Sequence, residues 1–138
     1  MEIVGRLIKE HGEMLGILDV MFALLAQAEK IQGEERGALV EKRLPGLQER
    51  LLGILKRHEH EEGELLSGEA ATLNGVVGRQ HMEIDEVFRI ASALIYLKDP
   101  GNLHTIQFAL RRIQDDLKQH FAYEERVVFP RLPASATS

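Results

Sequence analysis

Apolar residues recur at spacings of three and four along four stretches of this 138-residue chain. The first stretch covers about Glu2–Lys30, and the stripes of the other three run over Leu44–Leu65, Val77–Ile95 and Leu103–Val127. This spacing places the apolar side chains on one face of an α-helix, whereas a half-buried strand alternates every second residue. The pattern therefore predicts four amphipathic helices and leaves no segment for strands.

Glycine and proline mark the breaks between these helices. The predicted boundaries are Gln32–Gly33, Ser67–Gly68, Asp99–Pro100 and, at the end of the last helix, Pro130 and Pro133. Pro45 leaves two alternatives open, because it either starts the long part of the second helix or kinks a longer one.

The connections between the predicted helices are short, which favours an antiparallel, up-down-up-down four-helix bundle. A chain of this length is also large enough for one domain with a real core. We therefore predict an all-α fold, with one bundle over residues 1–132 and a flexible C-terminal tail over residues 133–138.

Histidines and acidic residues interrupt the apolar stripes at core positions. Three of the four histidines at these core positions are followed four residues later by an acid, which a helix places on the same face one turn away. A buried imidazole or carboxylate without a partner is costly, and a bound metal ion removes that cost. The candidate metal ligands are His11, His58, Glu62, His81, Asp85, His120 and Glu124.

The four candidate histidines are expected at one depth of the bundle. His11 and His58 lie about twenty residues on either side of the first turn, and His81 and His120 lie about seventeen and eighteen residues from the third. At a rise of about 1.5 Å per residue, these heights agree within a few ångströms. One buried histidine is more often a hydrogen-bonded core residue, but four at one height, with acids beside them, favour a metal site.

The remaining residues of interest are assigned to the surface or to the wall of the site. His60 points to a different face from His58, and His104 lies at the far end of its helix, so both are expected on the surface. Glu59 is expected on a mostly solvated face, although it is close enough to His58 to be a reserve ligand. The predicted apolar wall consists of Met14, Leu55, Phe88 and Leu117.

Composition excludes several classes of protein. The formal net charge is −5 without a basic run, which argues against nucleic-acid binding. The absence of cysteine excludes a disulfide framework and a thiolate zinc site. No apolar run approaches the ~20 residues of a membrane span, and the first residues do not resemble a signal peptide. We expect a soluble, cytoplasmic protein with no membrane and no nucleic-acid partner.

The candidate ligands are nitrogen and oxygen donors, and they are too many for one tetrahedral zinc ion. Such a set suits two ions of the iron or manganese kind, with carboxylates bridging them. Di-iron bundles of the ferritin-like kind use Glu-x-x-His spacing, whereas here the histidine precedes the acid by four residues. The order of the ligands therefore indicates a different family.

Four segments carry a resemblance to a known family: Lys9–His11, Arg57–Glu62, His81–Asp85 and His120–Pro130. Their order and spacing resemble a hemerythrin-like domain, also called an HHE cation-binding domain. The last segment, a His-x-x-x-Glu followed by another acid and an apolar run that ends in Phe-Pro, is the most specific. The resemblance extends from His11 to Pro130, which is nearly the whole chain.

The resemblance implies a non-haem di-iron centre. Glu62 and Glu124 would match the bridging carboxylates, the four histidines would match terminal ligands, and a small oxo or hydroxo bridge would complete the centre. Family members bind dioxygen or respond to nitric oxide, peroxide or iron level. Oxygen carriers have a second histidine where this chain has Asp85, and that departure favours sensing, iron handling, or peroxide and nitric oxide chemistry over oxygen carriage.

Three functions are open at this stage. The first is a binding or sensing module for a diatomic or peroxide ligand, and the second is a di-iron enzyme of the peroxidase or oxidase kind. The third is a structural bundle that a metal, such as zinc, holds together; manganese is a further substitute for iron. The sequence offers no separate substrate pocket or nucleophile, which places the binding module ahead of the enzyme.

Overall fold

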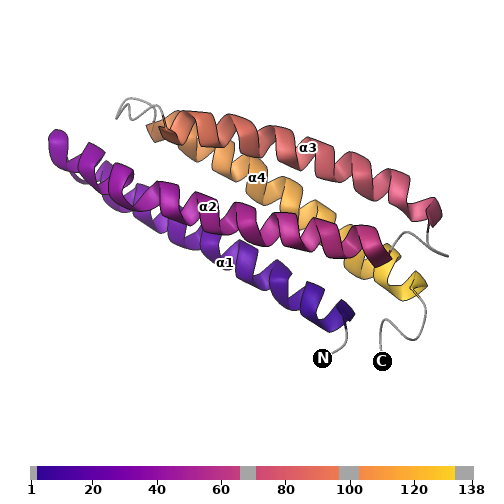
Figure 1. Ribbon diagram of the computed structural model, residues 1–138. Coiled ribbons are helices and arrows are strands. Elements are labelled where there is room, and N and C mark those ends of the chain that lie inside the picture. The colour runs from indigo at the N-terminus through magenta and orange to yellow at the C-terminus, as the bar shows by residue number, and fades with distance from the viewer. Residues whose placement is uncertain (1–2, 66–70, 97–102, 133–138) are drawn as a thin grey trace.

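The computed structural model describes residues 3–65, 71–96 and 103–132, and nearly all of them are helical (Figure 1). Four long helices follow one another, and the last continues through a π-helical turn into a short 3-10 turn. They are α1 (Ile3–Glu29), α2 (Glu34–Leu65), α3 (Ala71–Tyr96), α4 (Leu103–Tyr123), η2 (Glu124–Val128) and η3 (Phe129–Arg131). The described residues contain no strand, so the all-α prediction is confirmed.

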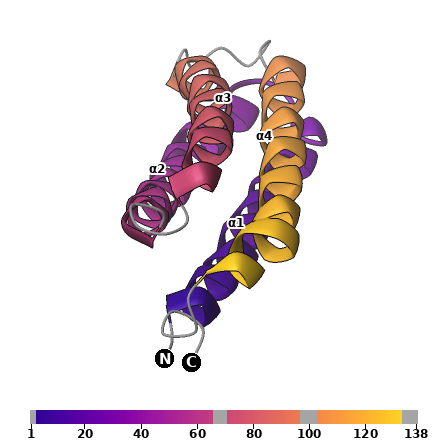
Figure 2. The same ribbon diagram turned by 90° about the vertical axis from the view of Figure 1, so that its right-hand side faces the viewer.

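Each helix packs mainly against two others: α1 and α3 both contact α2 and α4. Figures 1 and 2 show the four helices running along one another, with the start of α1 and the end of α4 at the same end of the molecule. This arrangement is compatible with the predicted up-down-up-down order. The predicted breaks at Ser67–Gly68 and Asp99–Pro100, Pro133 and the predicted tail lie outside the described residues.

The turn between α1 and α2 lies where glycine predicted it. Gly33 has a φ of 72°, a left-handed conformation that glycine adopts without a steric penalty. The last carbonyls of a helix have no partner within it. Arg36 supplies donors here: its Nε lies 2.9 Å from the oxygen of Ala28 and 2.8 Å from that of Ile31, and its Nη2 lies 3.0 Å from that of Glu29. One side chain thus closes α1 and fixes the start of α2.

Pro45 lies inside α2, which is one helix of 32 residues. Of the two alternatives that the sequence left open, the longer helix is therefore the observed one. Proline has no N–H to donate to the preceding turn, so this position lacks one hydrogen bond of the helical ladder.

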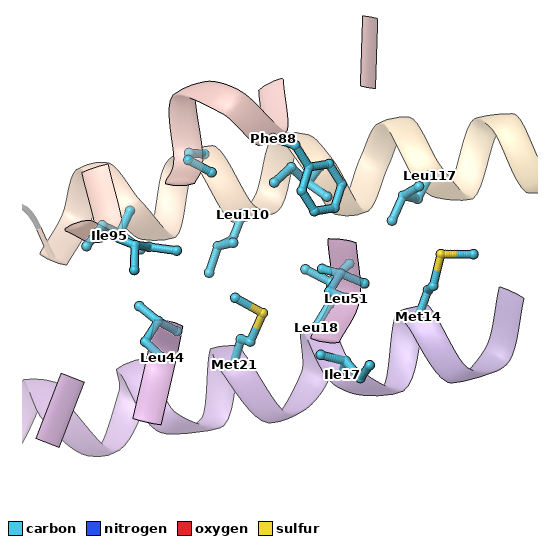
Figure 3. Packing of buried hydrophobic residues seen from close by; sticks show 14 of the residues in the cluster. Met14, Ile17, Leu18, Met21, Leu44, Leu51, Phe88, Ile95, Leu110 and Leu117 are labelled. Atoms are coloured by element: carbon cyan, nitrogen blue, oxygen red, sulfur yellow. The ribbon is translucent and has the colours of Figure 1, made fainter. Parts of the chain in front are cut away.

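A large apolar cluster fills the part of the bundle nearest the turn between α1 and α2 (Figure 3). It draws on Met14–Ala28 of α1, Leu44–Leu55 of α2, Ile84–Ile95 of α3 and Leu103–Phe121 of α4. A smaller cluster lies at the opposite end and consists of Val4, Leu7, Val77, Val128, Phe129 and Leu132. Burial of these side chains is the main source of stability, and the segment between the two clusters holds the histidines.

No helix that the structure describes is both long enough and apolar enough to cross a membrane. The cytoplasmic location stays a prediction.

Replacing Phe88 by alanine is expected to lower the free energy of unfolding by about 3–5 kcal/mol, because it empties the centre of a packed core. Phe88 is 1% exposed, whereas Phe108 is 74% exposed and provides the matched control. Phe108→Ala should change the free energy of unfolding by no more than about 0.5 kcal/mol. Urea denaturation of both variants measures the difference, and equal losses would contradict the assignment of the core.

Candidate metal centre

A layer of polar side chains separates the two apolar clusters. On α1, His11 lies between Leu7 of the small cluster and Met14 of the large one. On α4, His120 follows Leu117 of the large cluster, and η2 then carries Glu124 and Val128. His11, His58, Glu62, His120 and Glu124 are all buried, and His81 is half-buried. The helical repeat thus positions this layer, because each polar residue occupies a site on an otherwise apolar stripe.

The structure brings six of the seven predicted ligands into two adjoining groups. The first consists of His11, His58, Glu62 and Glu124, and the second of Glu62, His81 and His120. Within each group the candidate donor atoms lie within 4.8 Å of one another. The four histidines therefore meet at one depth, as the counting along the helices predicted.

The imidazoles meet in pairs through the same ring nitrogen. The Nε2 atoms of His11 and His58 are 3.1 Å apart, and so are those of His81 and His120. One pair joins α1 to α2, and the other joins α3 to α4.

Glu62 lies between the two imidazole pairs and turns one carboxylate oxygen to each. Its Oε1 is in close contact with Nε2 of His58. Its Oε2 lies 3.2 Å from Nε2 of His81 and 3.7 Å from Nε2 of His120. A carboxylate placed in this way has the arrangement of a bridge between two sites.

Glu124 faces both pairs from the other side, through one oxygen. Its Oε1 lies 2.8 Å from Nε2 of His120, 3.4 Å from that of His11 and 3.7 Å from that of His58. Glu124 is also the first residue of the π-helical turn, and its carbonyl accepts the N–H of Phe129. Wide turns of this kind are frequent at functional sites. Here the turn leaves Glu124 in the polar layer while it directs Val128 and Phe129 into the small cluster.

Three buried carboxylate oxygens in this layer form no hydrogen bond of ordinary geometry among the described residues, although imidazole nitrogens lie close to two of them. They are Oε1 of Glu62 and both oxygens of Glu124, and all three are fully buried. Buried polar atoms are normally satisfied, so an unsatisfied group calls for an explanation. A cation would satisfy these oxygens and the facing imidazole nitrogens together, and the donor set therefore fits a metal with nitrogen and oxygen ligands.

The charges in the layer are strongly coupled. Burial alone would lower the pKa of His58, but the carboxylates of Glu124 and Glu62 outweigh it and raise the pKa to about 10. The same balance, with the same two acids, raises the pKa of His120 to about 9. Burial opposes ionisation of Glu62, yet its contacts with Glu124 and three of the imidazoles hold the pKa of this carboxyl well below its usual range. Without a metal, protons on the imidazoles provide the balancing positive charge.

The outward ring nitrogens of three histidines have partners that the sequence did not predict. Nδ1 of His58 lies 3.1 Å from Oε1 of Glu10, and Nδ1 of His120 lies 2.6 Å from Oε1 of Gln80. Nδ1 of His11 lies 3.4 Å from Oε2 of Glu125. With a carboxylate or amide oxygen as the acceptor, the Nδ1–H donates and Nε2 is left to face the site.

A sequence signal for Glu10 did exist. Glu10 lies three residues after Leu7 and four before Met14, so it continues the apolar stripe and belongs on a buried face. It is 3% exposed. Gln80 and Glu125 each adjoin a predicted ligand in the sequence, which by itself does not distinguish them from surface residues.

The wall of the site is apolar and aromatic. Met14, Leu55, Phe88 and Leu117, the residues predicted for this wall, are all buried and belong to the large cluster. Phe121, which the prediction omitted, stacks on His11 with ring centroids 3.8 Å apart and planes at 9°. This contact fixes the plane of the His11 ring.

Asp85 is the predicted ligand that the structure does not bring into either group. Its side chain is exposed, because Ile84 beside it faces the core while Asp85 lies on the outer side of α3, and His81 one turn earlier is itself only half-buried. Its partner is Glu59 of α2, which is half-buried and not on a solvated face as expected. Burial and the neighbouring carboxylate of Asp85 raise the pKa of Glu59 to about 8.

Two histidines were assigned to the surface, and the structure confirms both. The side chain of His60 is 76% exposed and lies 3.2 Å from Glu64. The side chain of His104 is 87% exposed, at the far end of the bundle near Glu29.

Comparison with known families supports the same interpretation. Residues 72–137 match the family model described as Hemerythrin HHE cation binding domain. This match confirms the family resemblance and covers α3, α4, His81, His120 and Glu124. His11, His58 and Glu62 lie outside the matched residues, and the structure places them in the layer, as the sequence predicted. Searches of curated proteins and of solved structures give no match.

The metal-free protein is expected to lose stability as the pH rises from about 6.5 to 9. His58 and His120 have pKa values of about 10 and 9 when folded, above the ordinary 6.5, so the folded state keeps protons that the unfolded chain releases. Their contribution is complete below pH 6.5 and is lost as the pH rises through the folded values. Glu59 acts in the same direction up to about pH 8, and the contribution of Glu62 is constant in this range.

Urea denaturation in the presence of a chelator, at pH values from 6.5 to 9, measures this trend. The metal-loaded protein is the control, and its metal affinity should rise with pH because metal ligands must lose their protons. If the free energy of unfolding of the metal-free protein increased over this range, the assignment of protons to His58 and His120 would be contradicted.

Proposed function

We propose that this hemerythrin-like chain is a di-iron protein that binds or senses a small molecule such as dioxygen, nitric oxide or peroxide. In this proposal residues 1–132 form an antiparallel up-down-up-down four-helix bundle. The metal ligands are His11, His58, Glu62, His81, His120 and Glu124.

The position of the two buried carboxylates carries the proposal. Glu62 turns one oxygen to each imidazole pair, and Glu124 faces both pairs through Oε1. A single ion in the first donor group would leave the imidazoles of His81 and His120 unused, and a single ion in the second would leave the buried carboxylate of Glu124 uncompensated. Two ions would use all six side chains: His11 and His58 would hold one ion, His81 and His120 would hold the other, and Glu62 and Glu124 would serve both. They would also satisfy the three buried oxygens that form no hydrogen bond of ordinary geometry.

The donor chemistry and the family favour iron. Imidazole and carboxylate donors suit iron and manganese, and the chain has no cysteine to favour softer metals. Zinc accepts the same donors, but four-coordinate zinc would not use the full set. The family to which residues 72–137 match is described as cation-binding.

The surroundings favour a small ligand. A bridged iron pair, when bound, offers a position at which a diatomic molecule or peroxide can coordinate. The cavity of about 100 Å³ between α3 and α4 lies on the Gln80 side of His120, behind the imidazole, and does not supply the ligand space. The apolar wall that includes Phe121 and Met14 limits the access of water. The candidate donor atoms are buried and lie within 4.8 Å of one another in each group, which supports a ligand of diatomic size over an extended organic substrate.

Protein produced with iron available is expected to contain two iron ions per chain. Elemental analysis gives the number and identity of the ions, and an optical spectrum of aerobically purified protein tests for a bridged ferric pair, which absorbs in the near-ultraviolet. One zinc ion per chain and no iron, from iron-replete cells, would refute the proposal and favour a structural metal.

Replacing either bridging carboxylate should remove both ions. Glu62→Ala or Glu124→Ala is expected to reduce the metal content from two ions to less than one, because each carboxylate serves both positions. His60→Ala and His104→Ala remove exposed imidazoles and should retain two ions, and so should Asp85→Ala, whose side chain lies outside both groups. A full metal content in Glu62→Ala and Glu124→Ala, or a loss in His104→Ala, would contradict the ligand assignment.

A further inference from the structure

The two imidazole pairs differ in what lies behind them. Behind His58 is the carboxylate of Glu10, and behind His11, at a longer distance, is the carboxylate of Glu125. Behind His120 is the uncharged amide of Gln80. The direct partner of Nδ1 is therefore a carboxylate at His58 and a neutral amide at His120, where the carboxylates of Glu83 and Asp116 line the adjoining cavity.

Glu10 is built into the interior as a fixed charge. Its side chain is 4% exposed, and its two oxygens have separate partners. Oε1 accepts from Nδ1 of His58, and Oε2 accepts from Nε of Arg57 at 3.1 Å. The Arg57 side chain is 57% exposed, so it compensates the charge of Glu10 from the surface without entering the site. Glu125 has a weaker influence, because its side chain is 44% exposed and water screens its charge.

The second pair is also more accessible. The His81 side chain is 14% exposed, compared with 5% for His11 and 0% for His58. Gln80 and His120 line the cavity between α3 and α4, so solvent comes close to this pair. An ion at the second pair therefore has a shorter path to water than an ion at the first.

A carboxylate that accepts the Nδ1–H of a ligand imidazole makes its Nε2 a stronger donor to a metal and fixes the ring in place. An amide oxygen fixes the ring but adds no charge. We propose that the His11–His58 pair binds its cation more tightly than the His81–His120 pair does, and that Glu10 is the positioning residue that sets this difference. The inference rests on the proposed two-ion centre and adds that the His11–His58 pair binds its cation before the His81–His120 pair does.

Titration of the metal-free protein with cobalt(II) tests the proposal. The visible absorption of cobalt reports coordination directly, and competition with a chelator gives a dissociation constant for each step. The parent protein is expected to bind two equivalents, with the first dissociation constant at least about tenfold lower than the second, since partners behind a ligand are typically worth 10–100-fold in affinity.

Three variants locate the origin of the difference. Glu10→Gln retains an oxygen acceptor for His58 and removes the charge, so it should weaken the first step about tenfold or more and change the second less than about twofold. Gln80→Glu adds a charge behind His120 and should tighten the second step by a similar factor. Glu13→Gln is the matched control, because Glu13 is exposed and lines the same groove between α1 and α2 as Glu10. It should change neither step.

The proposal is overturned if Glu10→Gln leaves the first step unchanged or weakens both steps equally, or if Gln80→Glu weakens the second. Circular dichroism shows whether each variant folds. If Glu10→Gln does not fold, the effect of Gln80→Glu on the second step decides the question. If the parent binds a single equivalent, the two-ion function fails. If Glu10→Gln then weakens the binding of that one ion, the role of Glu10 is still supported. If Glu10→Gln leaves its dissociation constant unchanged, the role of Glu10 is refuted.

Discussion

The fold depends on how four imidazoles and two carboxylates are accommodated in an interior that is otherwise apolar. Isolated buried charges are unfavourable, so Glu62 and Glu124 must be balanced by positive charge. In the metal-free state the protons held by His58 and His120 provide it, as their raised pKa values indicate. A metal pair would provide the same balance with more ligands satisfied. Either way, the two carboxylates link all four helices, because each contacts imidazoles of both pairs.

Burial of the two apolar clusters offsets the free-energy cost of the polar layer, and the clusters also fix the position of that layer. The large cluster sets the spacing and relative heights of the four helices, and the small cluster closes the opposite end. Between them the polar layer is shielded from water on both sides, which strengthens each of its electrostatic contacts. The π-helical turn serves the same purpose on the last helix: it keeps Glu124 in the layer while Val128 and Phe129 return to the apolar packing.

The layer is not symmetric, and the asymmetry has a structural origin. On the first two helices, the buried carboxylate of Glu10 contacts the outward nitrogen of His58 and is held by Arg57. The last two helices bring an amide, a more exposed histidine and a small cavity. One side is therefore suited to hold an ion firmly and the other to exchange an ion. A centre with these two properties is consistent with a protein that reports on a small molecule or on iron itself.

The sequence by itself determined the helices and the composition of the polar layer, because both follow from local periodicity. The spacing of apolar residues predicted four helices, and the same spacing placed His11, His58, His81 and His120 at one depth. Gly33 likewise predicted the first turn. The sequence could not determine the features that depend on how the helices rotate against one another. The four-residue step from His81 to Asp85 is compatible with coordination, and only the packing of α3 against α2 turned Asp85 outward beside Glu59. The pairing of Glu10 with His58 spans two helices and 48 positions of the chain, so it too was decided by the tertiary structure.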